Sequence, residues 1–403
     1  MNTLSRLPVF PGTVDDTGRP ATLGVMGGGQ LGRMFVHAAQ RLGYFTAVLD
    51  PDPHSPAGRV SHHHIPFAYS DKQGLAQLAG LCNAITTEFE NVPASALQTL
   101  AESCPVAPGA AAVAIAQDRI EEKSHFTASA GVAGVTCAPY AVIATPEQLQ
   151  AVSADLLPGI LKTTRMGYDG KGQSRVTNRA ELAAAWAQLK QAPCVLEQLL
   201  PLALELSVLS ARSAAGAIVQ FPVQQNLHRD GILAVTQVPA PSASAALQAE
   251  ALASAARIAA SMDYVGVLCV EFFVLQDGRL IVNEMAPRPH NSGHYTMDAC
   301  DVSQFDLQVR AMTGLPLRAP RLHSPVVMLN LLGDLWFDVA GQQRPPAWAA
   351  VLALSGTHLH LYGKSDARPG RKMGHLNVTA DTAVEAEALA RQAAGLLGLP
   401  TDW

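Results

Sequence analysis

The sequence VEFFVLQDGRLIVNEMAPRPHNSGH, Val270–His294, carries the strongest fold signal in the chain. Two apolar runs lie on either side of QDG, which predicts antiparallel strands joined by a tight turn. Glu271 lies in the first strand and Glu284 in the second, so pairing across the hairpin brings both carboxylates together. With Asn283 they offer the hard oxygen ligands that Mg²⁺ takes alongside water and nucleotide phosphates. The alternative is a pair of solvated strand acids.

Polar residues follow the second strand directly: Arg288, His290, Asn291 and His294. Such a density of polar groups fits a binding site better than a core. A single histidine is nevertheless more often structural than catalytic, so each histidine keeps that alternative.

The neighbouring sequence extends the strand pattern from Leu202 to about Pro320. The apolar runs LELSVLSAR, AIVQFPV, GVLCVEFFVL and RLIVNEMAP, separated by turns, predict an antiparallel sheet. Between them, residues 243–262 are rich in alanine, the best helix former, and predict a helix.

A small α+β lobe is expected over about residues 138–201. Its strands, GILKTT and CVLEQLL, enclose the glycine-rich run RMGYDGKGQSRV. Glycines let backbone amides approach phosphate oxygens, and Lys162 and Lys171 supply positive charge. A plain surface hairpin is the alternative. Further on, Glu197 and Glu205 suit the amino group and ribose hydroxyls of an adenosine, although this signal is weak alone.

From Ala21 to about Pro108, the short strands predicted at TLGVMG, FTAVLD, AITTEFE and CPVAPG are separated by helices or loops, which predicts a parallel α/β domain. Its first turn, TLGVMGGGQLGRMF, fits G-x-G-x-x-G, with Asp50 after the next apolar run where a dinucleotide enzyme has a ribose-binding acid. The same turn serves other anions, or simply a close helix–strand contact. The next predicted helix, Ile115–Val132, connects to the lobe.

Composition narrows the class of protein. At 403 residues, with 48% hydrophobic residues, two to four domains are expected. A net charge of −5 with scattered Lys and Arg disfavours nucleic acid binding. The six cysteines are far apart, which favours free thiols in a reducing cytosol and suggests neither zinc nor disulfides. No apolar run is long enough for a membrane span, and no signal peptide is evident.

Ser61–His64, SHHH, is predicted to be a solvated loop.

Taken together, the motifs resemble those of the N5-carboxyaminoimidazole ribonucleotide synthetases of the ATP-grasp superfamily. The motifs in chain order are GGGQLGRM, TTEFENVP, QDRIEEK, LKTTRMGYDGKGQ, VLEQLLPLALELS, QNLHRDGIL, VEFFV, NEMAPRPHNSGHYT and RPGRKMGHLN. The resemblance extends from Thr22 to Asn377, and APRPHNSGHYT with RPGRKMGHLN is its most specific part. About twenty N-terminal residues and SHHH lie outside it.

The resemblance implies an ATP-grasp fold built from α/β and α+β domains. The implied parts are an N-terminal extension (1–20), a Rossmann-like parallel α/β domain (21–115), an ATP-grasp domain (116–320) and a small β-rich C-terminal domain (321–403). Within the ATP-grasp domain, a small lid lobe covers about residues 138–201 and an antiparallel sheet forms the larger lobe.

The implied activity is the ATP-dependent joining of bicarbonate to the amine of 5-aminoimidazole ribonucleotide in purine synthesis, through carboxyphosphate. The implied ATP-binding residues are Arg119, Lys162, Gly167, Tyr168, Asp169, Gly170, Lys171, Gly172, Gln173, Glu197, Gln198, Leu199, Leu200, Glu205, His228, Asn283 and Glu284. The implied catalytic residues are Arg288, His290, Asn291, Asp169 and Lys171. The implied substrate-binding residues are Gly29, Gln30, Leu31, Glu88, Tyr168, Arg371 and Lys372. Glu271 and Glu284 would hold Mg²⁺, or Mn²⁺.

Three other functions remain as alternatives: another ATP-grasp carboxylating enzyme such as a biotin carboxylase, an NAD-binding oxidoreductase, and an inactive nucleotide sensor. Biotin carboxylases are normally longer and lack RPGRKMGHLN, and an oxidoreductase would leave the acidic and glycine-rich motifs without a role. The resemblance therefore predicts ATP as co-substrate without biotin or NAD. It also implies a cytoplasmic homodimer that engages neither nucleic acid nor membrane.

Overall fold

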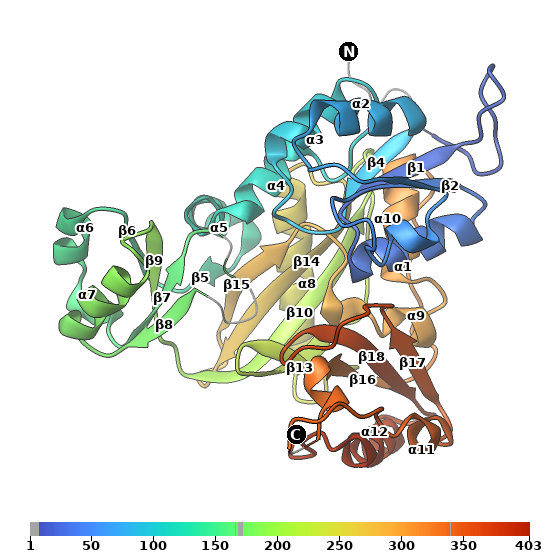
Figure 1. Cartoon of the computed structure of the whole chain (residues 1–403). Helices are drawn as coiled ribbons and strands as arrows, with labels where there is room; N and C mark the ends of the chain where they lie inside the picture. Colours follow the sequence, from blue (N-terminus) through green and yellow to red (C-terminus); the bar gives the residue numbers. More distant parts are fainter. Residues whose placement is uncertain (1–7, 166, 168–171, 339) are drawn as a thin grey trace.

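The structure, a computed structural model, describes residues 8–165, 167, 172–338 and 340–403. Three sheets organise these residues. In Figure 1 the N-terminal α/β part lies above a long central sheet, a small lobe projects to one side, and the C-terminal elements lie below.

The N-terminal sheet is parallel throughout, with the strand order β3-β2-β1-β4. Its elements and the helices that follow are β1 (Thr22–Met26), α1 (Gln30–Arg41), β2 (Phe45–Leu49), β3 (His63–Ile65), α2 (Lys72–Leu81), β4 (Ala84–Thr87), α3 (Ala94–Ala101) and α4 (Ala110–Gln117). Every residue of β1 and β4 is buried, as expected for parallel strands covered on both faces. The predicted parallel α/β domain is confirmed.

Two local predictions in this part are wrong. SHHH is not a loop, because His63 and His64 form β3 and pair with β2, although His62 and His63 are exposed as predicted. CPVAPG is not a strand: within it only Val106 makes an isolated bridge, to Ile85. The flanking prolines have no N–H to donate to a ladder, which explains the short pairing.

The predicted helix over residues 115–132 is two helices that meet at Asp118. α4 ends at Gln117, and α5 (Arg119–Ala133) begins with Asp118 as its N-cap, whose side chain accepts from the Ile120 amide at 3.0 Å. Gly134, with φ +71°, ends α5 in the left-handed conformation that glycine favours. The break points Arg119 toward the interior of the molecule.

The small lobe is an antiparallel sheet with the order β6-β9-β7-β8, covered by α6 and α7. The elements of this region are β5 (Thr136–Cys137), β6 (Tyr140–Ile143), α6 (Pro146–Ala151), β7 (Gly159–Thr163), β8 (Gln173–Val176), α7 (Arg179–Gln188) and β9 (Cys194–Gln198). Both predicted strands are present as β7 and β9, and the last four residues of the glycine-rich run, Gln173–Val176, form β8, which was not predicted.

The central sheet has the order β17-β18-β16-β13-β12-β10-β14-β15-β5, with β11 beside β10. Its pairs are antiparallel except β15 with β5. The elements are β10 (Leu202–Arg212), β11 (Ile218–Gln220), β12 (Gln224–Arg229), β13 (Ile232–Val238), α8 (Ala245–Ser261), β14 (Gly266–Leu275), β15 (Leu280–Ala286), α9 (Thr296–Ala299) and α10 (Gln304–Thr313). The predicted antiparallel sheet and alanine-rich helix are confirmed.

Buried contacts fix how the parts meet. On one face of the sheet, Ala255 and Ile258 of α8 pack with the apolar residues of β10 and β14. On the other, Leu307 of α10 packs against the sheet, while Phe305 and Val309 of the same helix pack with α1. α10 therefore joins the N-terminal α/β part to the central sheet.

The C-terminal elements are β16 (Val326–Leu332), α11 (Trp348–Leu352), β17 (Thr357–Leu361), β18 (Lys372–Thr379) and α12 (Ala383–Leu397). β16 pairs with β13, so these strands continue the central sheet and do not form a separate one. This continuity places β18, β16 and β13 side by side at one end of the central sheet (Figure 1).

Among the described residues, none of the helices combines the length and apolarity that a membrane crossing requires.

Candidate active site

A cleft of about 850 Å³ lies where the N-terminal part, the central sheet and the C-terminal strands meet. The residues predicted from the sequence that line it are Gln30, Leu31, Glu88, Arg119, Gly167, His228, Glu271, Glu284, Arg288, His290, Asn291, Arg371 and Lys372. They come from widely separated segments, so folding collects most of the predicted site in one place.

The hairpin carboxylates face each other across β14 and β15. Glu271 pairs directly with Glu284, whereas the next pair is Phe272 with Val282, so Asn283 is an extra residue in a β-bulge. Its Oδ1 is buried and accepts no hydrogen bond from the described residues. Two carboxylates and an amide oxygen without a donor form the ligand chemistry of a hard divalent cation, so these residues fit Mg²⁺.

Arg119 connects this pair to the glycine-rich segment. Its guanidinium lies 3.0 Å from Glu284 Oε2 and donates to the Gly167 carbonyl at 3.2 Å. Burial would raise the pKa of Glu284, but Arg119 and Lys162 outweigh it and lower that pKa to about 2. Glu284 is therefore ionised, and its side chain remains 38% exposed, on the wall of the cleft.

A buried cation pair surrounds Glu197 at the end of β9. Lys162 Nζ lies 3.1 Å and Lys123 Nζ 3.3 Å from Glu197 Oε2. Lys123 also donates to the Asn283 carbonyl at 2.9 Å. Lys123 was not predicted, although it lies in QDRIEEK, four residues after Arg119 and so on the same helix face. Lys123 therefore links Glu197 to the bulge.

Glu122, the residue before Lys123, is buried and accepts from the Met285 amide at 2.7 Å. Burial and the charge of Glu284 raise its pKa from 4.5 to about 8. The sequence did not mark it, because a carboxylate in an ordinary helix has no signature of burial.

Glu122 should make unfolding depend on pH. Below pH 4.5 the carboxyl is protonated in both states, and its contribution to stability is fully present. As pH rises from 4.5 toward 8, the unfolded chain ionises first, so folding stability falls by up to about 1.4 kcal/mol per pH unit. We expect Glu122→Gln to remove this fall, measured as the melting temperature of the ligand-free protein between pH 5 and 8.

The matched control is Glu121→Gln, since Glu121 is an exposed carboxylate on the same helix turn. It should melt like the wild type at every pH. Parallel pH profiles for wild type and Glu122→Gln would contradict the raised pKa.

Glu205 and His228 form an ion pair on adjacent strands, between Glu205 Oε2 and His228 Nδ1. Burial lowers the pKa of His228, but the hydrogen bond and charge of Glu205 raise it above its usual value. A register shift after Leu227 turns His228 toward the cleft. Glu205 itself does not line the cleft.

Arg288 and His290 each pair with a carboxylate. Arg288 Nε lies 2.7 Å from Glu90 Oε2, and His290 Nε2 lies 3.1 Å from Glu271 Oε1. Glu90 was missed, although it belongs to the quoted motif TTEFENVP. Asn291 is buried, and both polar atoms of its side chain have no hydrogen-bond partner among the described residues. An amide in this state suits a polar ligand in the cleft.

The N-terminal glycine turn holds a carboxylate of the chain itself. Glu88 accepts from the amides of Gly29 at 2.6 Å and Gly32 at 2.7 Å, while Asp50 accepts from Gly28 at 2.7 Å. These are amides that a dinucleotide pyrophosphate would need. The turn therefore positions Glu88, which lines the cleft. Asp50 contacts the turn itself and does not take the ribose-binding position of a dinucleotide enzyme.

On the opposite wall, Arg371 and Lys372 lie at the start of β18, beside Arg368 and Lys364. This wall is strongly basic. By contrast, His294 is buried outside the cleft, where it stacks on His375 at 4.6 Å between ring centroids and its pKa falls well below the usual value because of burial. It supports the loop, in line with the structural alternative.

Several predicted residues do not line the cleft. These are Gly29, Lys162, Gly172, Gln173, Glu197, Gln198, Leu199, Leu200, Glu205 and Asn283. Gln198 instead donates to the Asp155 carbonyl at 2.9 Å. Tyr168, Asp169, Gly170 and Lys171 lie outside the described residues.

Comparison with known proteins agrees with this geometry. Residues 21–117 match the ribonucleotide synthetase preATP-grasp domain, 129–305 the ATP-grasp domain and 326–389 the phosphoribosylaminoimidazole carboxylase C-terminal domain. An N5-carboxyaminoimidazole ribonucleotide synthase of Brucella melitensis is 46% identical over 360 residues, 88% of this chain and 95% of that protein. The chain belongs to the N5-carboxyaminoimidazole ribonucleotide synthase family.

Solved structures of this family superpose on the chain. The ADP complex of an N5-carboxyaminoimidazole ribonucleotide synthetase has a TM-score of 0.86 at 39% identity and covers 96% of this chain and 97% of its own. The Aspergillus clavatus enzyme with ADP and 5-aminoimidazole ribonucleotide has a TM-score of 0.84 at 32% identity, covering 94% and 98%. As a member of this ATP-grasp family, the enzyme is a ligase that carboxylates aminoimidazole ribonucleotide at the expense of ATP in purine biosynthesis.

Proposed function

We propose that the cleft joins bicarbonate to the amine of 5-aminoimidazole ribonucleotide through carboxyphosphate, with release of ADP and phosphate. The observation that carries this proposal is the arrangement of the cleft. The opposed carboxylates Glu271 and Glu284 line the cleft with Arg288, with the basic residues at the start of β18, and with Asn291, whose side-chain amide has no partner among the described residues.

ATP would lie between the small lobe and the central sheet. Arg119 and Lys162 would neutralise its phosphates, the segment from Gly167 to Gln173 would cover them, and Glu197–Leu200 would line the adenine edge. The pair Glu205 and His228 would bind the ribose, in keeping with their mutual contact. On binding, the phosphates would replace carboxylates as partners of Arg119 and Lys162.

Glu271, Glu284 and Asn283 would hold Mg²⁺, or Mn²⁺, which supplies charge neutralisation at the β- and γ-phosphates. Asn283 Oδ1, buried without a donor, is the observation that favours this assignment. The carbonyl of Asn283 is already fixed by Lys123, so the bulge is held in shape before the nucleotide arrives.

Bicarbonate would bind beside Arg288, His290 and Asn291, and its oxygen would attack the γ-phosphorus as ADP leaves. The resulting carboxyphosphate breaks down to phosphate and CO₂, and the substrate amine attacks CO₂ and loses a proton. The chain's contribution is positioning and charge neutralisation, and closure of the glycine-rich segment would exclude water. Lys171 would assist at the phosphoryl group, and Asp169 would orient the amine or accept its proton.

The aminoimidazole ribonucleotide would bind between the N-terminal turn and β18. Gly29, Gln30, Leu31 and Glu88 would contact it from one wall, and Tyr168 from the glycine-rich segment. Arg371 and Lys372 would bind its phosphate, which suits the basic character of that wall.

The wider organisation is also part of the proposal. The domains would be residues 21–115, 116–320 and 321–403, preceded by an extension over 1–20, with a lid lobe at about 138–201. A cytoplasmic homodimer, without biotin or NAD, would be the working form.

Steady-state phosphate release with MgATP and bicarbonate, measured with and without 5-aminoimidazole ribonucleotide, tests the reaction. We expect the ribonucleotide to stimulate release and to acquire one carboxyl group per phosphate. A biotin carboxylase would respond to biotin instead, and an inactive nucleotide sensor would release no phosphate.

Lys372→Ala tests the substrate wall. We expect the Michaelis constant for the ribonucleotide to rise about tenfold or more, since a charge-assisted contact to phosphate is lost, with little change in that for ATP. The control is Lys72→Ala, which removes an exposed lysine from α2. Equal increases for both substrates would remove Lys372 from the substrate site.

A further inference from the structure

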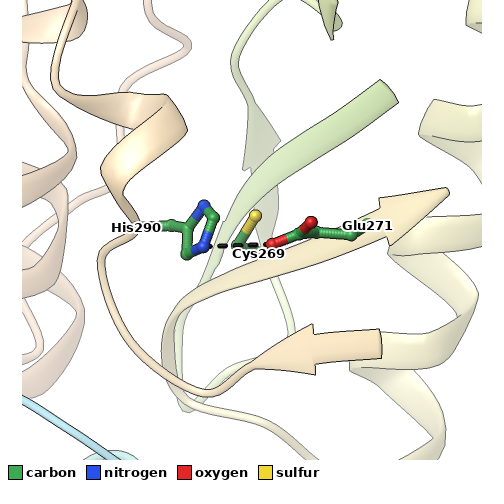
Figure 2. A group of neighbouring side chains, drawn as sticks. All are labelled: Cys269, Glu271 and His290. Carbon is green, nitrogen blue, oxygen red and sulfur yellow. Dashed lines mark ion pairs between the residues drawn. The ribbon is translucent and has the colours of Figure 1, made fainter. Parts of the chain in front are cut away.

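Cys269, Glu271 and His290 converge beside the cleft, which Glu271 and His290 line and behind which Cys269 is buried. Figure 2 shows the Cys269 sulfur lying between the imidazole of His290 and the carboxylate of Glu271. One ligand atom from each lies within 4.8 Å of the others, and the His290 Nε2 to Glu271 Oε1 distance is 3.1 Å. We propose that these three side chains form an inhibitory site for a thiophilic divalent ion, of which Zn²⁺ is the best fit.

The strand and the loop build this group together. Cys269 and Glu271 are two residues apart on β14, so their side chains leave the same face of the sheet. His290 reaches them from the turn after β15. Because no Cys-x-x-Cys spacing is involved, the cysteine pattern of the sequence argued against zinc, and only the fold assembles these ligands.

The geometry suits a tetrahedral ion. Zinc bonds of 2.0–2.3 Å to sulfur, nitrogen and oxygen place neighbouring ligand atoms about 3.3–3.7 Å apart. The sulfur must therefore approach the other two atoms by about 1.5 Å at most from the 4.8 Å bound, while the nitrogen-to-oxygen distance of 3.1 Å must open by a few tenths of an ångström. Glu271 and His290 also line the cleft, so water can supply the fourth ligand.

His290 is held through its second ring nitrogen, since the Ser292 amide donates to Nδ1 at 3.3 Å. Its Nδ1 lies 2.9 Å from Ser292 Oγ, and Ser207 donates to that oxygen at 2.9 Å. Ser207 and Ser292 are fully buried, so the ring is held with Nε2 toward the other two ligands. Ser292 Oγ also lies 3.9 Å from Cys269 Sγ.

The thiolate of Cys269 and the imidazole of His290 determine which kind of ion the site binds. Mg²⁺ prefers oxygen ligands in an octahedron, whereas sulfur and nitrogen donors favour zinc. When the ion binds, the S–H bond of Cys269 and the contact from His290 Nε2–H to the Glu271 carboxylate are replaced by bonds from these three side chains to the ion. The thiol proton goes to water. The Nε2 proton is exchanged through water for one on Nδ1, which then donates to Ser292 Oγ in place of the contact from the Ser292 amide.

An ion bound at this site would inhibit the enzyme, because Glu271 would no longer bind Mg²⁺ and His290 would no longer contact bicarbonate. This consequence rests on the proposed function, whereas binding of the ion does not. The two can therefore fail separately: Zn²⁺-free turnover tests the function, and metal binding without substrates tests the site.

The binding experiment uses Co²⁺ as a probe, since it occupies tetrahedral zinc sites and gives a thiolate-to-metal absorption band when sulfur is a ligand. The full-length protein, cleared of metal by a chelator, is titrated with Co²⁺ and then with Zn²⁺. We expect one band-forming site per chain, displaced by Zn²⁺, and its loss in Cys269→Ala. The matched control, Cys194→Ala, removes another fully buried strand cysteine and should keep the band.

The inhibition experiment measures carboxylation at saturating MgATP with increasing Zn²⁺. Cys269→Ala should raise the half-inhibiting Zn²⁺ concentration by about a hundredfold, the upper end of what loss of even an outer contact costs a metal site. Wild-type protein without the thiolate band would overturn the proposal. So would a band that persists in Cys269→Ala, or equal inhibition of both proteins. Cys269→Ser provides a second variant should the alanine protein not fold.

Discussion

Glu284→Gln should lower ATP-dependent turnover by about a thousandfold, on the order of the several kcal/mol that a catalytic metal supplies. Glu284 lies opposite Glu271 and pairs with Arg119 at 3.0 Å, so its charge would act both at the proposed cation site and on the arginine proposed to bind phosphate. Glutamine preserves the volume and one acceptor oxygen but removes the charge. Phosphate release and carboxylated product should fall together.

The fold should survive this change, because the Glu284 side chain is partly exposed to the cleft. Asp277→Asn is the control: it makes the same carboxylate-to-amide change in the exposed turn of the same hairpin and should leave turnover unchanged. Melting temperatures identify any loss of folding. Near-normal turnover of Glu284→Gln at low Mg²⁺ would remove Glu284 from the cation site.

The sequence predicted this hairpin because its signals are local. Apolar runs around QDG specify two strands, and pairing alone puts Glu271 near Glu284. The bulge at Asn283 was not predictable, since it depends on the carbonyl contact with Lys123, a residue 160 positions earlier in the chain. The alternation of apolar and polar residues indicates which residues form strands, but not where the pairing register between two strands shifts.

Buried charge was the least predictable feature. Lys123 and Glu122 look like ordinary helix-surface residues in QDRIEEK, yet both are buried because α5 packs below the hairpin. The break at Asp118 was missed for a related reason, since an aspartate within a helical pattern becomes a cap only when the chain turns there. The burial of Lys123 and Glu122 and the helix break at Asp118 depend on packing between distant segments of the chain. A local residue pattern does not predict that packing.

The glycine turn shows a motif whose geometry was predictable and whose occupant was not. Its amides do point at an anion, as G-x-G-x-x-G predicts, but the anion is the carboxylate of Glu88 from the end of β4. Burial raises the pKa of Glu88, whereas the amides of Gly32 and Gly29 and the charge of Arg288 favour its charged form.

Gly29→Val should therefore abolish use of the aminoimidazole ribonucleotide while ATP still binds. A Cβ at Gly29 would lie 2.5 Å from Glu88 Oε1, so valine must expel that carboxylate from the turn and from its place on the cleft wall. The residues proposed to bind ATP, around Lys162 and Glu284, belong to other elements, β7 and β15. We expect calorimetry to show ribonucleotide binding weakened by about a hundredfold or more, as when a charged hydrogen-bonding group is lost.

Gly109→Val is the matched control for this change. Gly109 is likewise an extended N-cap glycine, of α4, but nothing lies within 4 Å of a Cβ built on it. It should bind both substrates normally, which separates the effect on Glu88 from the cost of valine at a helix start. NAD binding by the wild type that Gly29→Val abolishes would restore the dinucleotide reading of the turn. Loss of ATP binding with ribonucleotide binding unaffected would place the turn in the ATP site instead. Glu88 would then contact ATP, and the basic wall at β18 would bind the ribonucleotide without help from α1.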